Sequence, residues 1–165
     1  FSISETPIPD FNSMTFLLSN DDRVFFNVDN GEDTTFKFRR KILEEMGNQY
    51  NIEFTQQELV MFEKYPSPIG LPIQNMKEFL NADASARRDM ETGIPIDSAD
   101  NQLAMWVLYA RKVNPNVKAT IKGDADTQFP TVKKVLDILQ EKNVNRFNLV
   151  TSLEAVKINL DEIQQ

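Results

Sequence analysis

The sequence predicts an α+β fold in which a two-layer mixed β-sheet carries helices on one face. Residues 14–29 contain two short runs with alternating apolar side chains, and residues 117–122 alternate strictly between apolar and polar. Apolar residues spaced three and four apart precede and follow that later run, which is typical of amphipathic helices. The predicted order is a β-hairpin, then α-β-α-β, with a helical segment inserted after the hairpin.

The hairpin is predicted at residues 14–19 and 23–29, with Asn20, Asp21 and Asp22 forming the turn between them. Successive side chains of a strand point to opposite faces, so each of these strands has one apolar face. The buried face of the hairpin is predicted to consist of Met14, Phe16, Leu18, Val24, Phe26 and Val28.

Residues 30–97 are predicted to form a helical insertion rather than a separate domain, because they carry few large apolar side chains for a core of their own. Gly47 is predicted to end the first helix of this insertion. Thr55 and Glu58 have the spacing of a capping box and predict the start of the second. The helices expected in the insertion cover residues 34–46, 55–65 and 73–80.

The last third of the chain alternates helix and strand. We expect a helix at 98–114, a strand at 117–122, a helix that begins near Pro130 and is capped by Asn143, and a strand at 147–151. The chain is therefore divided into a linker at 1–13, one domain at 14–152 with the insertion at about 30–97, and a C-terminal tail at 153–165.

The composition excludes several classes of function. The chain has 165 residues, a net charge of −7, and neither Cys nor His. Without Cys it has no disulfide, thiolate zinc site or cysteine nucleophile, and without His it lacks the commonest general base and metal ligand. The acidic balance argues against nucleic-acid binding, which needs clustered Lys and Arg. The five glycines are isolated, so no phosphate-binding loop is present. We therefore expect no enzyme activity and no cofactor.

Asp124 and Asp126 are the one pair of carboxylates that suggests an alternative. They follow a predicted strand and precede a predicted helix, where aspartates are common turn and helix-start residues. Carboxylates in such a turn also bind divalent cations, although Ca²⁺ needs six or more oxygen ligands and the EF-hand spacing is absent. A small-ligand or metal-binding domain that uses these two residues is one alternative function.

A more specific pattern runs through residues 117–154. A strand ends in Lys122, Gly123 and Asp124, a polar turn follows, and a helix then reads V-x-x-V-h-D-h-L over 132–139, where h is apolar. The last strand reads F-N-L-V-T. This combination resembles the C-terminal periplasmic module of the ExbD/TolR family of biopolymer-transport proteins. The predicted hairpin and first helix also fall where that family places its own, and the long insertion marks this chain as a long ExbD-like variant.

The resemblance implies a periplasmic domain that belongs to a proton-motive-force-driven membrane motor and has no catalytic activity of its own. Its partners would be an ExbB-like membrane subunit, a TonB-like protein that energises outer-membrane transport, and a second copy of itself. The resemblance also implies an anchor in the inner membrane, through an N-terminal transmembrane helix that carries the proton-binding Asp. This chain contains no such helix and begins with Phe1, so we expect the linker at 1–13 to follow it.

The last strand is our predicted partner-binding edge. An exposed sheet edge binds an extended peptide by strand addition, and it also pairs with a second copy across a two-fold axis. The residues predicted for this role are Phe147, Asn148, Leu149, Val150 and Thr151. The resemblance leaves an alternative open, since a TolR-like subunit would bind peptidoglycan and support envelope integrity.

Overall fold

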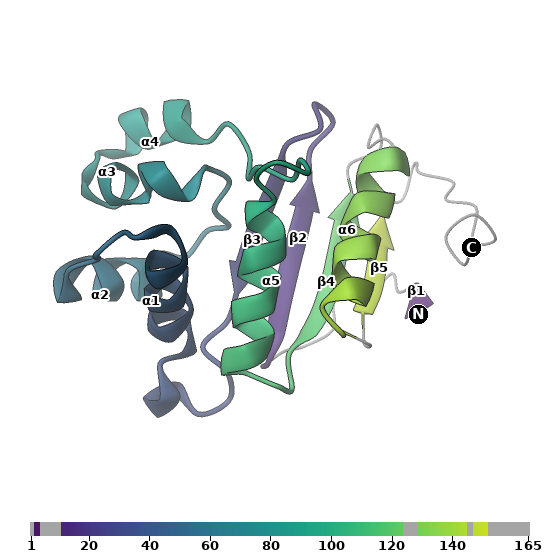
Figure 1. The fold of residues 1–165 in the computed structure, drawn as a ribbon, viewed down its shortest axis with the longest axis horizontal. Helices are drawn as coiled ribbons and strands as arrows, with labels where there is room; N and C mark the ends of the chain where they lie inside the picture. The colour runs from purple at the N-terminus through teal and green to yellow at the C-terminus, as the bar shows by residue number, and fades with distance from the viewer. Residues whose placement is uncertain (1, 4–10, 124–128, 145–146, 152–165) are drawn as a thin grey trace.

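The computed structural model describes residues 2–3, 11–123, 129–144 and 147–151, and its elements are shown in Figure 1. Its strands are β1 (Ser2–Ile3), β2 (Ser13–Leu18), β3 (Val24–Val28), β4 (Lys118–Gly123) and β5 (Phe147–Thr151). Its helices are α1 (Phe38–Tyr50), α2 (Gln56–Lys64), α3 (Met76–Asn81), α4 (Ala84–Met90), α5 (Gln102–Val113) and α6 (Phe129–Glu141), with short 3-10 helices η1 (Thr34–Phe36) and η2 (Ile73–Asn75).

The strands form one mixed sheet, and the predicted α+β class is confirmed. Their order is β1-β5-β4-β2-β3. The β2–β3 hairpin is antiparallel, and Phe16 pairs with Phe26 at its centre. All the other neighbouring strands run parallel. The six apolar residues predicted for the buried face of the hairpin are all at most 3% exposed, because alternation along each strand places them on the same face.

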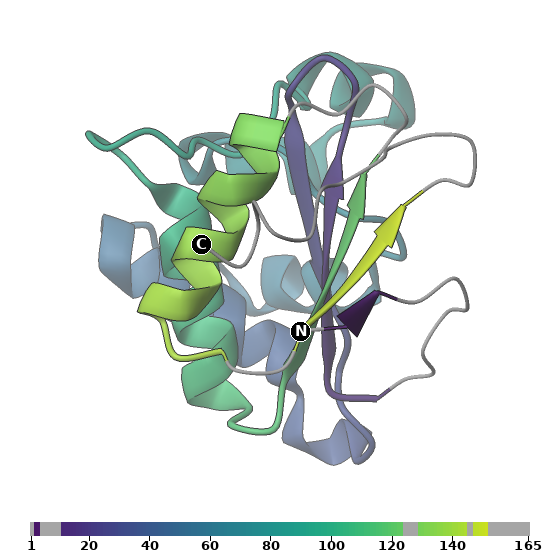
Figure 2. The same cartoon turned by 90° about the vertical axis from the view of Figure 1, so that its right-hand side faces the viewer.

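The two faces of the sheet differ. Helices α5 and α6 lie against one face, and helices α1 to α4 lie beyond the outer edge of β3 (Figures 1 and 2). Within the described part of the chain, none of these helices has the length and apolar character that crossing a bilayer requires.

The insertion shares the core of the sheet. Trp106 of α5 lies at the junction: its ring centroid is 5.6 Å from that of Phe26 in β3 and 5.8 Å from that of Phe62 in α2. All three rings are almost fully buried. A single hydrophobic cluster therefore joins the hairpin, the insertion and α5. The insertion therefore packs directly against the hairpin and α5 and belongs to the same core.

The predicted helices of the insertion are confirmed in part. Thr55 and Glu58 form the capping box, since each side chain accepts a hydrogen bond from the other residue's backbone N–H. Helix α4 was not predicted, because its sequence has no apolar stripe; Asp83 caps it by accepting from the N–H of Ala86. The predicted linker at 1–13 is corrected at both ends, since residues 2–3 form a strand and β2 already begins at Ser13. The predicted tail at 153–165 lies outside the described residues.

Gly47 does not end α1, contrary to the prediction. The helix continues to Tyr50, and Asn51 ends it in the left-handed conformation with φ 58°. Gly47 is instead buried inside the helix, where a Cβ atom would lie 2.5 Å from the carbonyl oxygen of Ile52 and 2.9 Å from the ring of Phe54. The close approach of the chain after the helix is the reason for glycine at this position.

We predict that Gly47→Ala destabilises the protein although alanine is the better helix former. Helix propensity alone favours alanine by about 1 kcal/mol. The clash with the Ile52 carbonyl should cost more, as overpacking of a core does, so the free energy of unfolding should fall by about 1–2 kcal/mol. Urea unfolding followed by the fluorescence of Trp106, the single tryptophan, measures this change.

Asn48→Ala is the matched control, because Asn48 is the exposed neighbour on the same helix. It should leave the free energy of unfolding unchanged or raise it by a few tenths of a kcal/mol, roughly the propensity difference. A Gly47→Ala protein more stable than the unaltered chain would contradict the packing argument.

Candidate functional site

The outer edge of β3 is covered by the insertion. The three β3 carbonyl groups that point away from β2 belong to Val24, Phe26 and Val28. They accept hydrogen bonds from the N–H of Ile94 (3.0 Å), from the N–H of Ile69 (2.9 Å) and from the Arg39 guanidinium. The N–H of Phe26 also donates to the Ile69 carbonyl at 2.8 Å. An incoming strand therefore finds no free carbonyl along this edge, which is how natural sheets prevent unwanted pairing.

Arg39 is the centre of this covered edge. Its side chain is buried, and its guanidinium donates to neutral oxygens from three segments: the Asn27 side chain at 2.7 Å, the Phe62 carbonyl at 2.9 Å and the Tyr65 carbonyl at 3.3 Å, besides the carbonyl of Val28. The guanidinium carbon also lies 4.5 Å from the ring centroid of Phe62. These contacts hold α1, the end of α2 and the end of β3 together.

Burial lowers the pKa of Arg39 to about 10, while the negative charges of Asp29 and Glu63 act to raise it. The guanidinium therefore remains protonated at pH 7 and keeps its donors. No neutral side chain of the same shape replaces this guanidinium, because its planar fork donates several hydrogen bonds to carbonyl oxygens at once.

On the opposite side of the sheet, the described residues cover β5 with the short strand β1. Ser2 pairs with Asn148 and Ile3 pairs with Leu149, so within the part of the chain that the structure describes β1 contributes two residues to the outer side of β5. The prediction that β5 is the edge strand of the sheet is wrong, because β1 lies beyond it in the strand order. A pairing of two residues is far shorter than the usual strand of about five, so it contributes little stability. The partner-binding role of Phe147–Thr151 stays a prediction.

The structure describes two of the three residues of the motif turn, which we define as Lys122, Gly123 and Asp124. Lys122 and Gly123 end β4, where they pair with Val150 and Thr151 of the parallel strand β5. Asp124 and Asp126 lie outside the described residues. Among the residues that the structure does describe, no group of three or more carboxylates is placed to hold a metal ion.

Comparisons with known proteins add no family to this picture: no protein-family model, no curated protein and no solved structure matches the chain.

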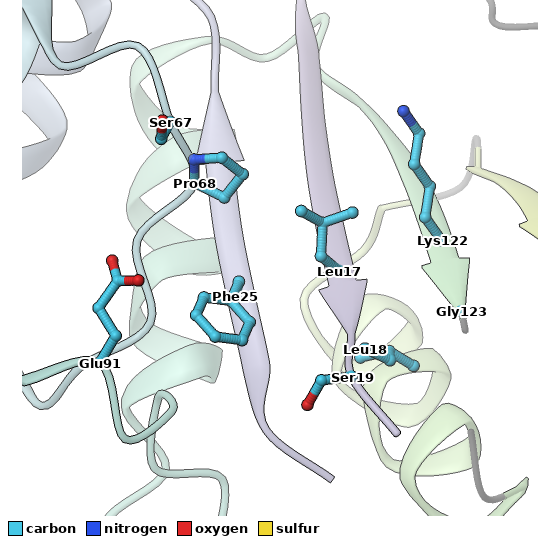
Figure 3. Close-up of a pocket in the computed structure, with 9 residues that line it drawn as sticks. All are labelled: Leu17, Leu18, Ser19, Phe25, Ser67, Pro68, Glu91, Lys122 and Gly123. Carbon is cyan, nitrogen blue, oxygen red and sulfur yellow. The ribbon is translucent and has the colours of Figure 1, made fainter. Parts of the chain in front are cut away.

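A groove that the sequence did not predict lies beside the motif turn on the face of the sheet opposite α5 and α6 (Figure 3). It has a volume of about 480 Å³. Leu17 and Phe25 lie on its floor, Pro68 and Glu91 come from the insertion, and Lys122 comes from β4. Sequence reasoning missed it because four of these residues lie far from Lys122 along the chain and carry no motif.

We predict that Arg39→Met lowers the free energy of unfolding by about 2–4 kcal/mol, since several buried carbonyl groups lose their donor at once. Arg39→Lys should recover less than half of this loss, because one ammonium group does not reach all the acceptors that a guanidinium reaches. Urea unfolding monitored by Trp106 fluorescence measures both variants.

Lys41→Met, at an exposed position of the same helix, is the control and should change the free energy of unfolding by less than about 0.5 kcal/mol. If Arg39→Met proved as stable as Lys41→Met, the hydrogen bonds of Arg39 would not be what holds the insertion to β3.

Proposed function

We propose that this chain is the periplasmic domain of an ExbD-like subunit, which couples an ExbB-like complex of the inner membrane to a TonB-like protein for outer-membrane transport. The proposal is supported by the order of the elements that carry and surround the sequence pattern of residues 117–154. The pattern runs over β4, α6 and β5, in the same sheet as the β2–β3 hairpin, and α5 leads into it. In this proposal the domain stands on the periplasmic face of the membrane and the family's membrane helix precedes Phe1.

The observation that carries the proposal furthest is the difference between the two sides of the sheet. The carbonyl groups on the outer side of β3 accept hydrogen bonds from Ile94, Ile69 and Arg39, whereas among the described residues β5 has the two-residue strand β1 beside it. A partner that binds by strand addition needs a row of backbone groups, and β5 is where such a row is most easily released. We therefore place the TonB-like partner beside Phe147–Thr151, in exchange for β1.

The same backbone groups would pair two copies of the domain, since a two-fold axis brings identical strands together. In this proposal the domain transmits force through contacts and does no chemistry, and it needs no cofactor.

The test is a titration of the ¹⁵N-labelled chain with synthetic peptides that cover the periplasmic part of a TonB-like protein. We expect the amide signals of Ser2, Ile3 and Phe147–Thr151 to shift together, because the peptide replaces β1 beside β5. A pull-down with purified peptidoglycan is run in parallel. Retention on peptidoglycan without any peptide response would favour the TolR-like alternative and contradict our proposal.

We predict that Ser2→Pro/Ile3→Pro raises the affinity for the partner peptide by at least about threefold. Proline has no backbone N–H, so β1 loses its donors and stops competing for β5. Calorimetry measures the dissociation constant, and sedimentation velocity shows whether the released edge pairs with a second copy instead.

Ser2→Ala/Ile3→Ala is the matched control, because alanine keeps both N–H groups, and its affinity should stay within about twofold of the unaltered chain. Equal affinities for the proline and alanine variants, with no gain in dimer, would show that β1 does not occupy the binding edge.

A further inference from the structure

The groove lies at the carboxyl ends of two adjacent parallel strands. Leu18, the last residue of β2, pairs with Gly123, the last residue of β4. From there the chain continues in opposite directions across the sheet: β2 leads to β3 on one side, and β4 leads through α6 to β5 on the other. Crevices outside the carboxyl ends of parallel strands are the usual place where open sheets bind ligands.

The floor of the groove is apolar and only partly covered. Leu17 and Phe25 are neighbours on β2 and β3, and Pro68 lies over the same side of β3 (Figure 3). Gly70 brings the insertion so close that an added Cβ would lie 2.3 Å from the Phe25 ring, so the ring is fixed against the insertion. The Arg23 guanidinium carbon lies 5.4 Å from the centroid of the same ring. The floor is thus an apolar surface that the insertion contacts through Phe25.

Glu91 forms one wall of the groove and has an unsatisfied group. Its backbone carbonyl accepts from Arg23 at 2.9 Å, which fixes the residue beside Phe25. Its side-chain oxygen Oε1 is buried and has no hydrogen-bond partner in the described part of the chain. Burial raises the pKa of this carboxyl, and the charge of Arg23 lowers it in part. A buried carboxylate oxygen without a donor makes the charged form of Glu91 costly, and a cationic group beside this carboxylate would offset that cost.

Lys122 lies on the opposite side of the floor from Glu91, with Phe25 and Leu17 between them (Figure 3). Its side chain is exposed and carries a positive charge. Neighbouring strands in a sheet are about 4.8 Å apart, so β3 and β4, which lie on either side of β2, are roughly 10 Å apart. The segment that holds Glu91 lies beyond β3 and adds roughly another 5 Å to the width of the groove. Two opposite charges thus flank an apolar floor about 15 Å wide.

We infer that this groove binds a short extended peptide segment with a basic side chain at Glu91, apolar side chains on Leu17 and Phe25, and an acidic group at Lys122. An extended chain advances about 3.3 Å per residue, so about four residues span the floor. The methylene stem of a lysine or arginine also packs well on an apolar surface while its charged end meets a carboxylate. This inference is independent of the proposed function, because the groove is on the face of the sheet opposite α5 and α6, and its described lining residues belong to β2, β3, β4 and the insertion rather than to β5.

The test uses the whole chain and the peptide acetyl-Arg-Leu-Phe-Asp-amide, with calorimetry at about 50 mM salt, where charge pairs are only moderately screened. We expect a dissociation constant below about 1 mM. Replacing the peptide's arginine by glutamine should weaken binding to the unaltered protein about tenfold. The same replacement should weaken binding to the Glu91→Gln protein less than twofold, because that protein already lacks the pair between the arginine and Glu91. Replacing its aspartate by asparagine should weaken binding about threefold to the unaltered protein and leave binding to Lys122→Met unchanged.

Two matched variants control for charge alone. Glu32→Gln removes an exposed carboxylate in the loop after β3, and Lys118→Met removes an exposed amine at the other end of β4. Both should bind all three peptides like the unaltered protein. Glu91→Gln should also keep or raise the thermal midpoint at pH 7, since a carboxyl with a raised pKa destabilises the folded chain once the pH lies above that pKa.

The absence of binding, or an equal loss for the glutamine peptide in the unaltered and Glu91→Gln proteins, would overturn the inference. Amide shifts confined to Phe147–Thr151 on addition of the peptide would also overturn it, because they would place the peptide beside β5. That outcome would leave the proposed function standing, whereas shifts at Leu17, Phe25 and Lys122 support the groove whatever the outcome of the partner titration.

Discussion

The buried guanidinium of Arg39 is the interaction on which the arrangement of the insertion depends. It donates to oxygens at the end of β3 and at the end of α2, and it lies on the face of the Phe62 ring. Its acceptors are neutral, so the stability of the cation comes from several short hydrogen bonds rather than from one ion pair. Without these bonds the carbonyl groups at the junction of hairpin and insertion would be buried and unsatisfied.

Two consequences follow from this anchoring. The insertion covers the outward-pointing carbonyl groups of β3 through Ile69, Ile94 and Arg39, so this edge is closed to strand addition. The same segments also place Pro68 and Glu91 against Phe25 and so build one wall of the groove. The insertion thus covers one edge of the sheet and contributes to the lining of the groove.

Local signals account for the elements that were predicted. The hairpin follows from alternation, the start of α2 from the capping box of Thr55 and Glu58, and the end of α6 from Asn143, whose φ is 61°. The failures share a different cause. Gly47 remains in a helix because residues after that helix pack against it, and the strand at residues 2–3 exists only through β5. Neither fact is encoded within a few residues of the position concerned.

The sequence by itself determined the α+β class, the order of the hairpin, α5, β4, α6 and β5 along the chain, and the buried faces of β2, β3 and β4. It also excluded chemistry that needs Cys or His. These are properties of local spacing and composition. Only the tertiary structure decided that Arg39 is buried, that one side of the sheet is covered, and that Glu91 lies across a groove from Lys122. Each of these depends on segments tens of residues apart meeting in space, and periodicity within one segment carries no information about which distant segment it will meet.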